Sequence, residues 1–145
     1  KIDTYTQWIS GCCILVKISV IKKVGLLDNR FFIYFEDADW SIRMTKLGYK
    51  LGVVPKSIIY HHSSGSNKKN NTSNEGNLSP YAHYLNVRNH IYLIKKHSFF
   101  FNNLGSWMYQ ILKITSYSIY FILRGRLGKF KMVWRGVLDG IKIEI

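Results

Sequence analysis

The order of apolar and polar positions divides the chain into three parts. Residues 1–62 carry short apolar runs, bounded by Gly, Pro or acidic residues, that alternate with helical patterns, as in an α/β domain. Residues 63–79 (SSGSNKKNNTSNEGNLS) are poor in apolar side chains and rich in Ser, Asn and Gly, which predicts a flexible loop. Residues 80–145 carry three helical patterns and predict a helical tail.

Within the first part, the pattern predicts several strands and two helices. We expect strands at 7–16, 31–35, 49–54 and 57–62. Gly11 lies inside the first strand, where a missing side chain lets another group approach the backbone closely. We expect one helix at 19–24, capped by Ser19 and ended by Gly25, and a second at 38–47.

The helical tail predicts helices at 81–97, 104–123 and 128–141. The segment 104–123 approaches the length of a membrane span, but Lys113 at its centre argues against spanning. Its aromatic residues and the flanking Arg124 and Arg126 would suit a membrane interface. Three alternatives therefore stay open: packing on a catalytic domain, association with a membrane surface, and a true span.

Composition and charge narrow the choice of partners. An apolar fraction of 47% predicts a globular protein, and a net charge of +13 attracts anions. Residues 80–145 contain ten Lys or Arg and two acids, so the tail is basic. Because the basic residues form no known nucleic-acid-reading motif, we expect no nucleic-acid partner.

The cysteines and the first residues of the chain indicate where the protein would be found and whether it is whole. Cys12 and Cys13 are adjacent and without metal-site spacing, as expected of a protein in a reducing compartment. The chain opens without Met and without a signal-peptide pattern, so we interpret it as a fragment of a longer protein.

An acidic cluster interrupts this basic protein at the expected strand-to-helix junction. Glu36, Asp37 and Asp39 repel one another unless a cation or a helix N-terminus offsets their charge. One interpretation is structural: a carboxylate caps the helix and Arg43 pairs with Asp39 four residues earlier. The other is a general base that receives a proton from a substrate hydroxyl. Both hold together if Asp39 is structural and Asp37 is catalytic.

Two histidines follow the last expected strand of the first part. His61 and His62 would point to opposite sides of a strand. A single His is usually a structural or surface residue, but imidazole near carboxylates also suits Mn²⁺ and similar ions. Spacing alone does not bring the histidines and the acidic cluster together.

These motifs, taken in order over residues 8–66, resemble glycosyltransferase family 2, in its rhamnosyltransferase-like branch. The matching segments are Gly11-Cys12-Cys13-Ile14-Leu15, Val24-Gly25-Leu26-Leu27-Asp28-Asn29-Arg30-Phe31-Phe32, Tyr34-Phe35-Glu36-Asp37-Ala38-Asp39-Trp40-Ser41-Ile42-Arg43, Gly48-Tyr49-Lys50-Leu51, Val54-Pro55 and His61-His62-Ser63. The resemblance implies the C-terminal part of a GT-A domain, which is Rossmann-like, followed by a helical tail.

The resemblance also implies a catalytic pair. In the family the second carboxylate of the Glu-Asp pair is the base, which maps to Asp37, and a His some two dozen residues later helps to hold a divalent metal, which maps to His61 with His62 as the fallback. Family members bind a nucleotide-diphosphate sugar and Mn²⁺ or Mg²⁺, and they invert the anomeric centre. The expected partners are that donor, a glycan or lipid-linked acceptor, and a membrane surface.

The resemblance places other residues around this pair. Trp8, Gly11 and Glu36 map to positions that bind the acceptor or the donor sugar. Asp39 and Arg43 map to positions that hold the junction together.

One departure from the family concerns the donor side. The Asp-x-Asp that grips metal and diphosphate is absent, since Asp37-Ala38-Asp39 lies in the acceptor-side motif. We therefore expect these residues alone to be inactive and not to retain the metal. The whole protein is expected in the cytoplasm, peripheral at the inner face of a bacterial membrane, in cell-surface polysaccharide synthesis. The alternative is a non-catalytic membrane-associated or assembly domain derived from a glycosyltransferase.

Overall fold

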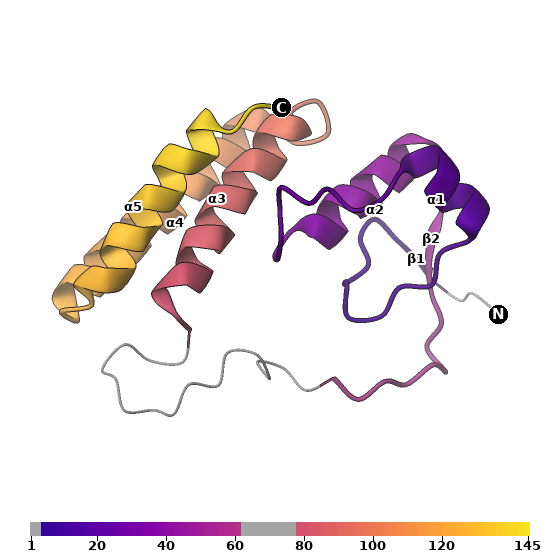
Figure 1. Cartoon of the computed structure of the whole chain (residues 1–145), viewed down its shortest axis with the longest axis horizontal. Helices are drawn as coiled ribbons and strands as arrows, with labels where there is room; N and C mark the ends of the chain where they lie inside the picture. The colour runs from indigo at the N-terminus through magenta and orange to yellow at the C-terminus, as the bar shows by residue number, and fades with distance from the viewer. Residues whose placement is uncertain (1–3, 62–77) are drawn as a thin grey trace. The chain divides into compact units, whose positions relative to one another are not determined.

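The computed structural model describes residues 4–61 and 78–145, which lie in two compact units, Lys1–Ser63 and Ser64–Ile145 (Figure 1). The elements of the first unit are β1 (Thr4–Thr6), α1 (Ile18–Val24), α2 (Glu36–Lys46) and β2 (Leu51–Val53). Those of the second are α3 (Pro80–Lys96), α4 (Asn103–Leu123) and α5 (Leu127–Lys142). The described chain is thus rich in helix and has one small sheet. The predicted loop 63–79 and His62 fall almost wholly outside the described residues.

The sheet joins the beginning of the first unit to the chain after α2. Strands β1 and β2 pair antiparallel, with Thr4 opposite Val53 and Thr6 opposite Leu51. Strand β2 confirms the strand predicted within 49–54. Gly48, with φ of +80°, turns the chain out of α2, as its position in the sequence predicts.

Three other predicted strands are wrong. Residues 7–16 form no regular strand and are not buried, since Leu15 is exposed. Residues 31–35 form tight turns in which Phe31 and Phe32 donate their N–H groups to Asp28 and Asn29. Residues 57–61 have no regular structure. An apolar run becomes a strand only when another strand supplies its backbone partners, and in 7–16 and 31–35 side chains and turns accept several of the backbone N–H groups instead.

The two helices of the first unit are present with shifted starts. Helix α1 begins after Lys17, so the predicted Ser19 cap is wrong, whereas Gly25 ends the helix at φ of +83° as predicted. Helix α2 begins at Glu36, two residues before the predicted start, because Phe35 adopts a left-handed conformation and acts as N-cap residue. Asp37 consequently lies in the first turn of α2 instead of capping it.

The three helices predicted in the second unit are confirmed. Ser79 caps α3 through its hydroxyl, which accepts the Ala82 N–H at 3.1 Å, and Asn102 caps α4 by accepting the Gly105 N–H at 3.2 Å. The helices share a small buried core of Val87, Ile91, Phe121 and Val133.

Helices α3 and α5 approach each other closely at two glycines. A Cβ added at Gly136 would lie 2.7 Å from the Tyr84 carbonyl oxygen, and one added at Gly140 would lie 2.9 Å from that of Arg88. Both glycines are buried. The absence of side chains at these positions therefore sets the distance between the two helices.

Candidate functional site

The carboxylate of Asp37 is held at the start of α2 by two backbone groups. Its Oδ2 accepts the N–H of Gly11 at 2.7 Å, and its Oδ1 accepts the N–H of Ala38 at 2.7 Å. Gly11 lies 26 residues earlier in the chain. Asp37 remains partly exposed. The carboxylate is thus fixed in place and still open to a ligand, and the helix N-terminus favours its negative charge.

The group nearest to Gly11 is Asp37, at distances that a side chain at Gly11 would tolerate as ordinary van der Waals contact. A Cβ built at this position would lie 3.4 Å from the Asp37 Cβ and 3.5 Å from its Oδ2. The close approach predicted for Gly11 is therefore that of Asp37, although the segment is an irregular turn and no strand.

The backbone leading into α2 is strained. Phe32, Tyr34 and Phe35 have φ of 62°, 72° and 70°, in the left-handed region that side-chain-bearing residues avoid. Each such residue costs roughly 1–3 kcal/mol and persists only where its surroundings hold it. Phe31, which is fully buried, anchors the segment. Strain of this kind gathers at functional sites, and here it immediately precedes the acidic pair.

Glu36 presents an unsatisfied polar atom. Its Oε2 is buried and has no hydrogen-bond partner among the described residues. Burial raises the pKa of the Glu36 carboxyl, and the neighbouring charge of Asp37 raises it further, while a hydrogen bond from its own backbone opposes both. A buried acceptor of this kind fits a ligand hydroxyl, since an unmade hydrogen bond there is costly.

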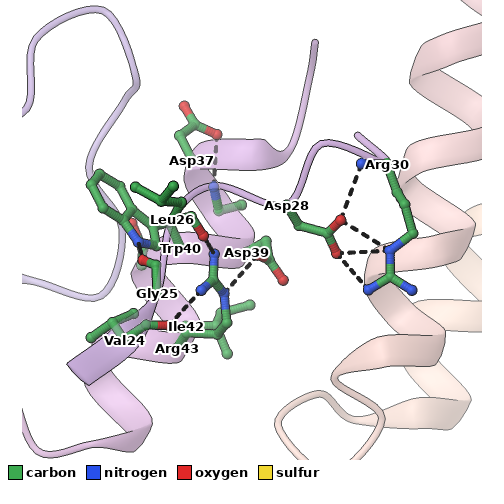
Figure 2. Close-up of polar contacts among 12 residues, drawn as sticks. Val24, Gly25, Leu26, Asp28, Arg30, Asp37, Asp39, Trp40, Ile42 and Arg43 are labelled. Carbon is green, nitrogen blue, oxygen red and sulfur yellow. Dashed lines mark hydrogen bonds and ion pairs between the residues drawn. The ribbon is translucent and has the colours of Figure 1, made fainter. Parts of the chain in front are cut away.

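Asp39 and Arg43 form the predicted pair on α2. Asp39 is fully buried, and its Oδ2 lies 2.8 Å from Nε of Arg43. The other guanidinium nitrogens donate to the carbonyl oxygens of Val24 and Leu26, both at 2.7 Å (Figure 2). One side chain thus neutralises a buried carboxylate and also satisfies carbonyls at the end of α1.

Two contacts of α2 were not anticipated from the sequence. The indole N–H of Trp40 donates to the Gly25 carbonyl at 2.9 Å, so the three successive carbonyls of Val24, Gly25 and Leu26 at the end of α1 are bound by α2. The Ser41 hydroxyl, which is fully buried, accepts the Ile9 N–H at 3.3 Å. A serine on the buried side of an amphipathic helix is the signal that could have revealed this second contact.

The structure brings some predicted site residues together. The first turn of α2 contains Glu36 and Asp37, and Gly11 is hydrogen-bonded to Asp37 there. Trp8 is 54% exposed and lies on the segment that α2 binds through Ser41 and Asp37. His61 is exposed. Within 4–61 and 78–145, no group of three or more His, Cys, Asp or Glu could hold a metal ion. The described residues therefore do not form a complete metal site.

Comparison with known proteins shows which enzymes this chain is similar to. The chain's curated homologues are rhamnosyltransferases, which confirms the resemblance to the rhamnosyltransferase-like branch of glycosyltransferase family 2. The chain matches no protein-family profile and no solved structure.

The particular relatives are bacterial. An N-acetylglucosaminyl-diphospho-decaprenol L-rhamnosyltransferase of Mycobacterium tuberculosis is 34% identical over 91 residues, which is 63% of this chain and 27% of the relative. Rhamnosyltransferase WbbL of Escherichia coli is 32% identical over 66 residues, 46% of this chain and 25% of the relative. The dTDP-rhamnosyl transferase RfbF of Shigella flexneri is 28% identical over 82 residues, 57% of this chain and 28% of the relative. The matches thus span about a quarter of the length of these relatives.

Proposed function

We propose that the chain is part of an inverting glycosyltransferase of GT-A fold. It would transfer a sugar from a nucleotide-diphosphate sugar to a hydroxyl of a glycan or lipid-linked acceptor. The names of the relatives support this: one is a dTDP-rhamnosyl transferase, and another is named for a lipid-linked diphosphate sugar. Nucleotide-linked rhamnose is accordingly the donor class favoured here.

The observation that carries the proposal is the anchored and reachable carboxylate of Asp37. Asp37 is the general base: its carboxylate takes the proton of the acceptor hydroxyl as the hydroxyl oxygen bonds to the anomeric carbon. The bond from that carbon to the donor diphosphate breaks in the same step, and the nucleotide diphosphate leaves with the electron pair. A single displacement of this kind inverts the anomeric centre and needs no protein nucleophile.

Neighbouring residues would bind the sugars. The unpaired Oε2 of Glu36 is an acceptor for a sugar hydroxyl beside the base. Trp8 lies on the same segment as Gly11, and its exposed ring could pack against the apolar face of a sugar. Asp39 and Arg43 hold the two helices and keep α2 in place.

A divalent ion is a further part of the proposal. His61 would be one of its ligands, and the others must come from beyond the described residues or from the donor diphosphate, because no three-ligand group is present in 4–61 and 78–145. Such an ion, when bound, neutralises charge on the departing diphosphate. The proton transfer to Asp37 does not pass through it.

The test is Asp37→Asn in the full-length parent protein. The amide keeps the shape of the side chain but cannot take a proton, so kcat for sugar transfer should fall about 10²–10⁴-fold. Binding of the nucleotide sugar, measured by calorimetry, should change little, because the base acts on the acceptor.

The matched control is Asp28→Asn, which removes the negative charge of an aspartate that pairs with Arg30 in the same unit. Its transfer rate should stay near that of the parent. An Asp37→Asn protein that transfers sugar at the parental rate would remove the base assignment.

We propose also that the helical unit lies against an anionic membrane surface. No helix in the described residues is both long and apolar enough to cross a bilayer. Helix α4 nevertheless exposes large apolar side chains along its length, and residues 80–145 carry ten Lys or Arg against two acids. The exposed apolar residues of α4 are Leu104, Met108, Tyr109, Ile111, Leu112, Ile119, Tyr120, Ile122 and Leu123. An apolar stripe on a basic unit is complementary to anionic lipid.

Vesicle flotation tests this placement. The chain should float with vesicles that contain anionic lipid and should remain in solution with purely zwitterionic vesicles at the same salt concentration. The double variant Leu112→Gln/Ile119→Gln should bind several-fold more weakly, whereas Thr115→Gln, a change at an exposed polar position of α4, should not. Failure to float with anionic vesicles at low salt would exclude a membrane surface as the partner of this face.

A further inference from the structure

The two cysteines of the chain are adjacent on an exposed turn. Cys12 and Cys13 form no disulfide, and both are exposed to solvent. In a strand, neighbouring side chains would point to opposite faces. Residues 11–13 form an irregular turn and no strand, so that alternation does not keep the two sulfur atoms apart. This pair of thiols has no part in the proposed transfer chemistry.

The turn directly follows the contact that anchors Asp37. The N–H of Gly11 donates to Oδ2 of Asp37 at 2.7 Å, and the N–H of Ile9 donates to the Ser41 hydroxyl at 3.3 Å. Both acceptors belong to α2. The segment is thus bound to α2 at residues 9 and 11, and the thiols come immediately after. A change in the shape of the turn therefore reaches the hydrogen bond between Gly11 and Asp37 first.

The sulfur of Cys12 is hydrogen-bonded on the other side of Gly11. The Ser10 hydroxyl donates to Cys12 Sγ at 3.2 Å. The N–H of Gly11 belongs to the peptide group that joins Gly11 to Ser10. Drawing the sulfur of Cys12 toward Cys13 breaks its contact with Ser10, so the change acts on the residue that carries this peptide group.

A disulfide between adjacent residues is strained. The Cα atoms of neighbours joined by a trans peptide are about 3.8 Å apart. Disulfide-bonded cysteines usually have Cα atoms about 4.4–6.8 Å apart. Closing the ring must therefore deform the backbone of the turn, and a strained disulfide is readily reduced again. Adjacent cysteines are consequently suited to a reversible modification and not to holding a fold together.

We propose that Cys12 and Cys13 are a redox-modification site whose oxidation to a disulfide withdraws the Gly11 N–H from Asp37. The oxidant is a small-molecule disulfide such as oxidised glutathione. One protein thiolate attacks it, which forms a mixed disulfide and releases one glutathione thiolate. The second protein thiolate attacks the protein sulfur of the mixed disulfide and releases the other. The protein loses two electrons and two protons, and the oxidant gains them as two thiols.

The inference rests on the proposed function only for its effect on sugar transfer. If Asp37 is the base, oxidation removes one of its two backbone hydrogen bonds but leaves its charge and its contact with Ala38. Oxidation of the parent protein should lower kcat about tenfold, because the base is less well positioned. Dithiothreitol should restore the rate, and the double variant Cys12→Ser/Cys13→Ser should not respond to the oxidant.

Thiol counting in the 145-residue chain tests the chemistry, because this chain has two cysteines. In glutathione buffers of rising oxidised fraction, both thiols should be lost together, with a mass lower by two hydrogen atoms and no glutathione attached. Cys13→Ser, which cannot close the ring, should instead retain one glutathione. A parental chain that ends as a glutathione adduct or as a disulfide-linked dimer would overturn the proposal.

Amide hydrogen exchange followed by NMR tests the link to Asp37. Oxidation should make the Gly11 N–H exchange about tenfold faster, since it loses its acceptor. Gly105 is the matched control, because its N–H also donates to a side-chain oxygen, Oδ1 of Asn102 at 3.2 Å, in the helical unit. Its exchange should change less than twofold. Unchanged exchange at Gly11 in the oxidised chain would contradict the link.

The coupling must also act in reverse, because linkage between two equilibria is reciprocal. Asp37→Ala removes the acceptor of the Gly11 N–H, so the equilibrium constant for disulfide formation should rise several-fold. Asp28→Ala, which removes an aspartate that pairs with Arg30 in the same unit, should change it less than twofold. Equal constants in the Asp37→Ala and parental chains would show that the two sites are not coupled.

The readouts from the 145-residue chain are independent of sugar transfer. If they fail, Asp37 can still be the base of the parent protein. If Asp37→Asn instead transfers sugar at the parental rate, the redox site and its hydrogen-bond coupling still stand. The two proposals therefore fail separately.

Discussion

A single side chain, Arg43, connects much of the first unit. It neutralises the fully buried Asp39 and binds the carbonyls of Val24 and Leu26. Removing one partner of a buried pair leaves the other charge without compensation, which is far more costly than losing an exposed pair. Arg43 therefore affects the site through the position of α2 and not through contact with a reacting group.

We expect Arg43→Gln to lower the free energy of unfolding of the first unit by about 3 kcal/mol. Arg30→Gln, which breaks the more exposed pair with Asp28, should cost about 1 kcal/mol or less. Urea unfolding followed by tryptophan fluorescence measures both. Adding Asp39→Asn to Arg43→Gln should recover part of the loss, and equal costs for the two arginine variants would contradict this account.

Some site residues can be predicted from the spacing of neighbouring residues in the sequence, whereas others are predicted only from the family resemblance. The Asp39–Arg43 pair follows from a spacing of four on a helix. The contact of Gly11 with Asp37 joins residues 26 apart, and no local pattern contains it. The roles of Asp37 and His61 come from the resemblance and stay predictions.

The packing of helix α5 against helix α3 depends on two glycines of α5, Gly136 and Gly140. A methyl group at either position would overlap backbone atoms of α3, and a backbone cannot move aside as a flexible side chain does. The two glycines lower the intrinsic helix propensity of α5, which is the cost of this close approach.

Gly136→Ala and Gly140→Ala should each destabilise the helical unit by about 1–3 kcal/mol. Gly105→Ala is the control, because its Cβ would meet Asn102 at an ordinary 3.5 Å and alanine favours the helix. Thermal unfolding followed by circular dichroism should show a lower Tm for the first two variants and an unchanged or higher Tm for the third. Unchanged stability in Gly136→Ala would show that the helices are not in close contact.

The sequence predicts the helices better than it predicts the strands. All three helices of the second unit were found because apolar residues at spacings of three and four are a local signal. The segments 7–16 and 31–35 have strand-like composition, but a strand needs partners elsewhere in the chain. In 31–35 the aromatic residues instead form turns with left-handed φ, which no propensity scale favours.

Across the whole molecule, two neutral histidines link stability to pH. Burial, together with the charge of Lys113, lowers the pKa of His83 and of His90 to about 4, and a hydrogen bond with Gln110 opposes this shift at His90. The unfolded chain binds these protons near pH 6.5, whereas the folded chain does not until about pH 4. Stability is therefore lost as the pH falls from about 6.5 to about 4.

The expected loss is about 2 kcal/mol for each histidine between pH 7 and pH 5. Urea unfolding at the two pH values, followed by circular dichroism, measures it. His90→Gln should reduce the pH dependence by about half. A helical unit as stable at pH 5 as at pH 7 would show that these rings are not held in their neutral form.

Helix α1 depends for its stability on hydrogen bonds from α2. It has seven residues, and a helix shorter than about 12–15 residues is marginal in water by itself. The three carbonyls that follow one another at its end are bound by Arg43 and Trp40 of α2. Helix α1 is thus conditional on α2: a sugar that shifts the first turn of α2 would loosen or tighten a helix that it never touches.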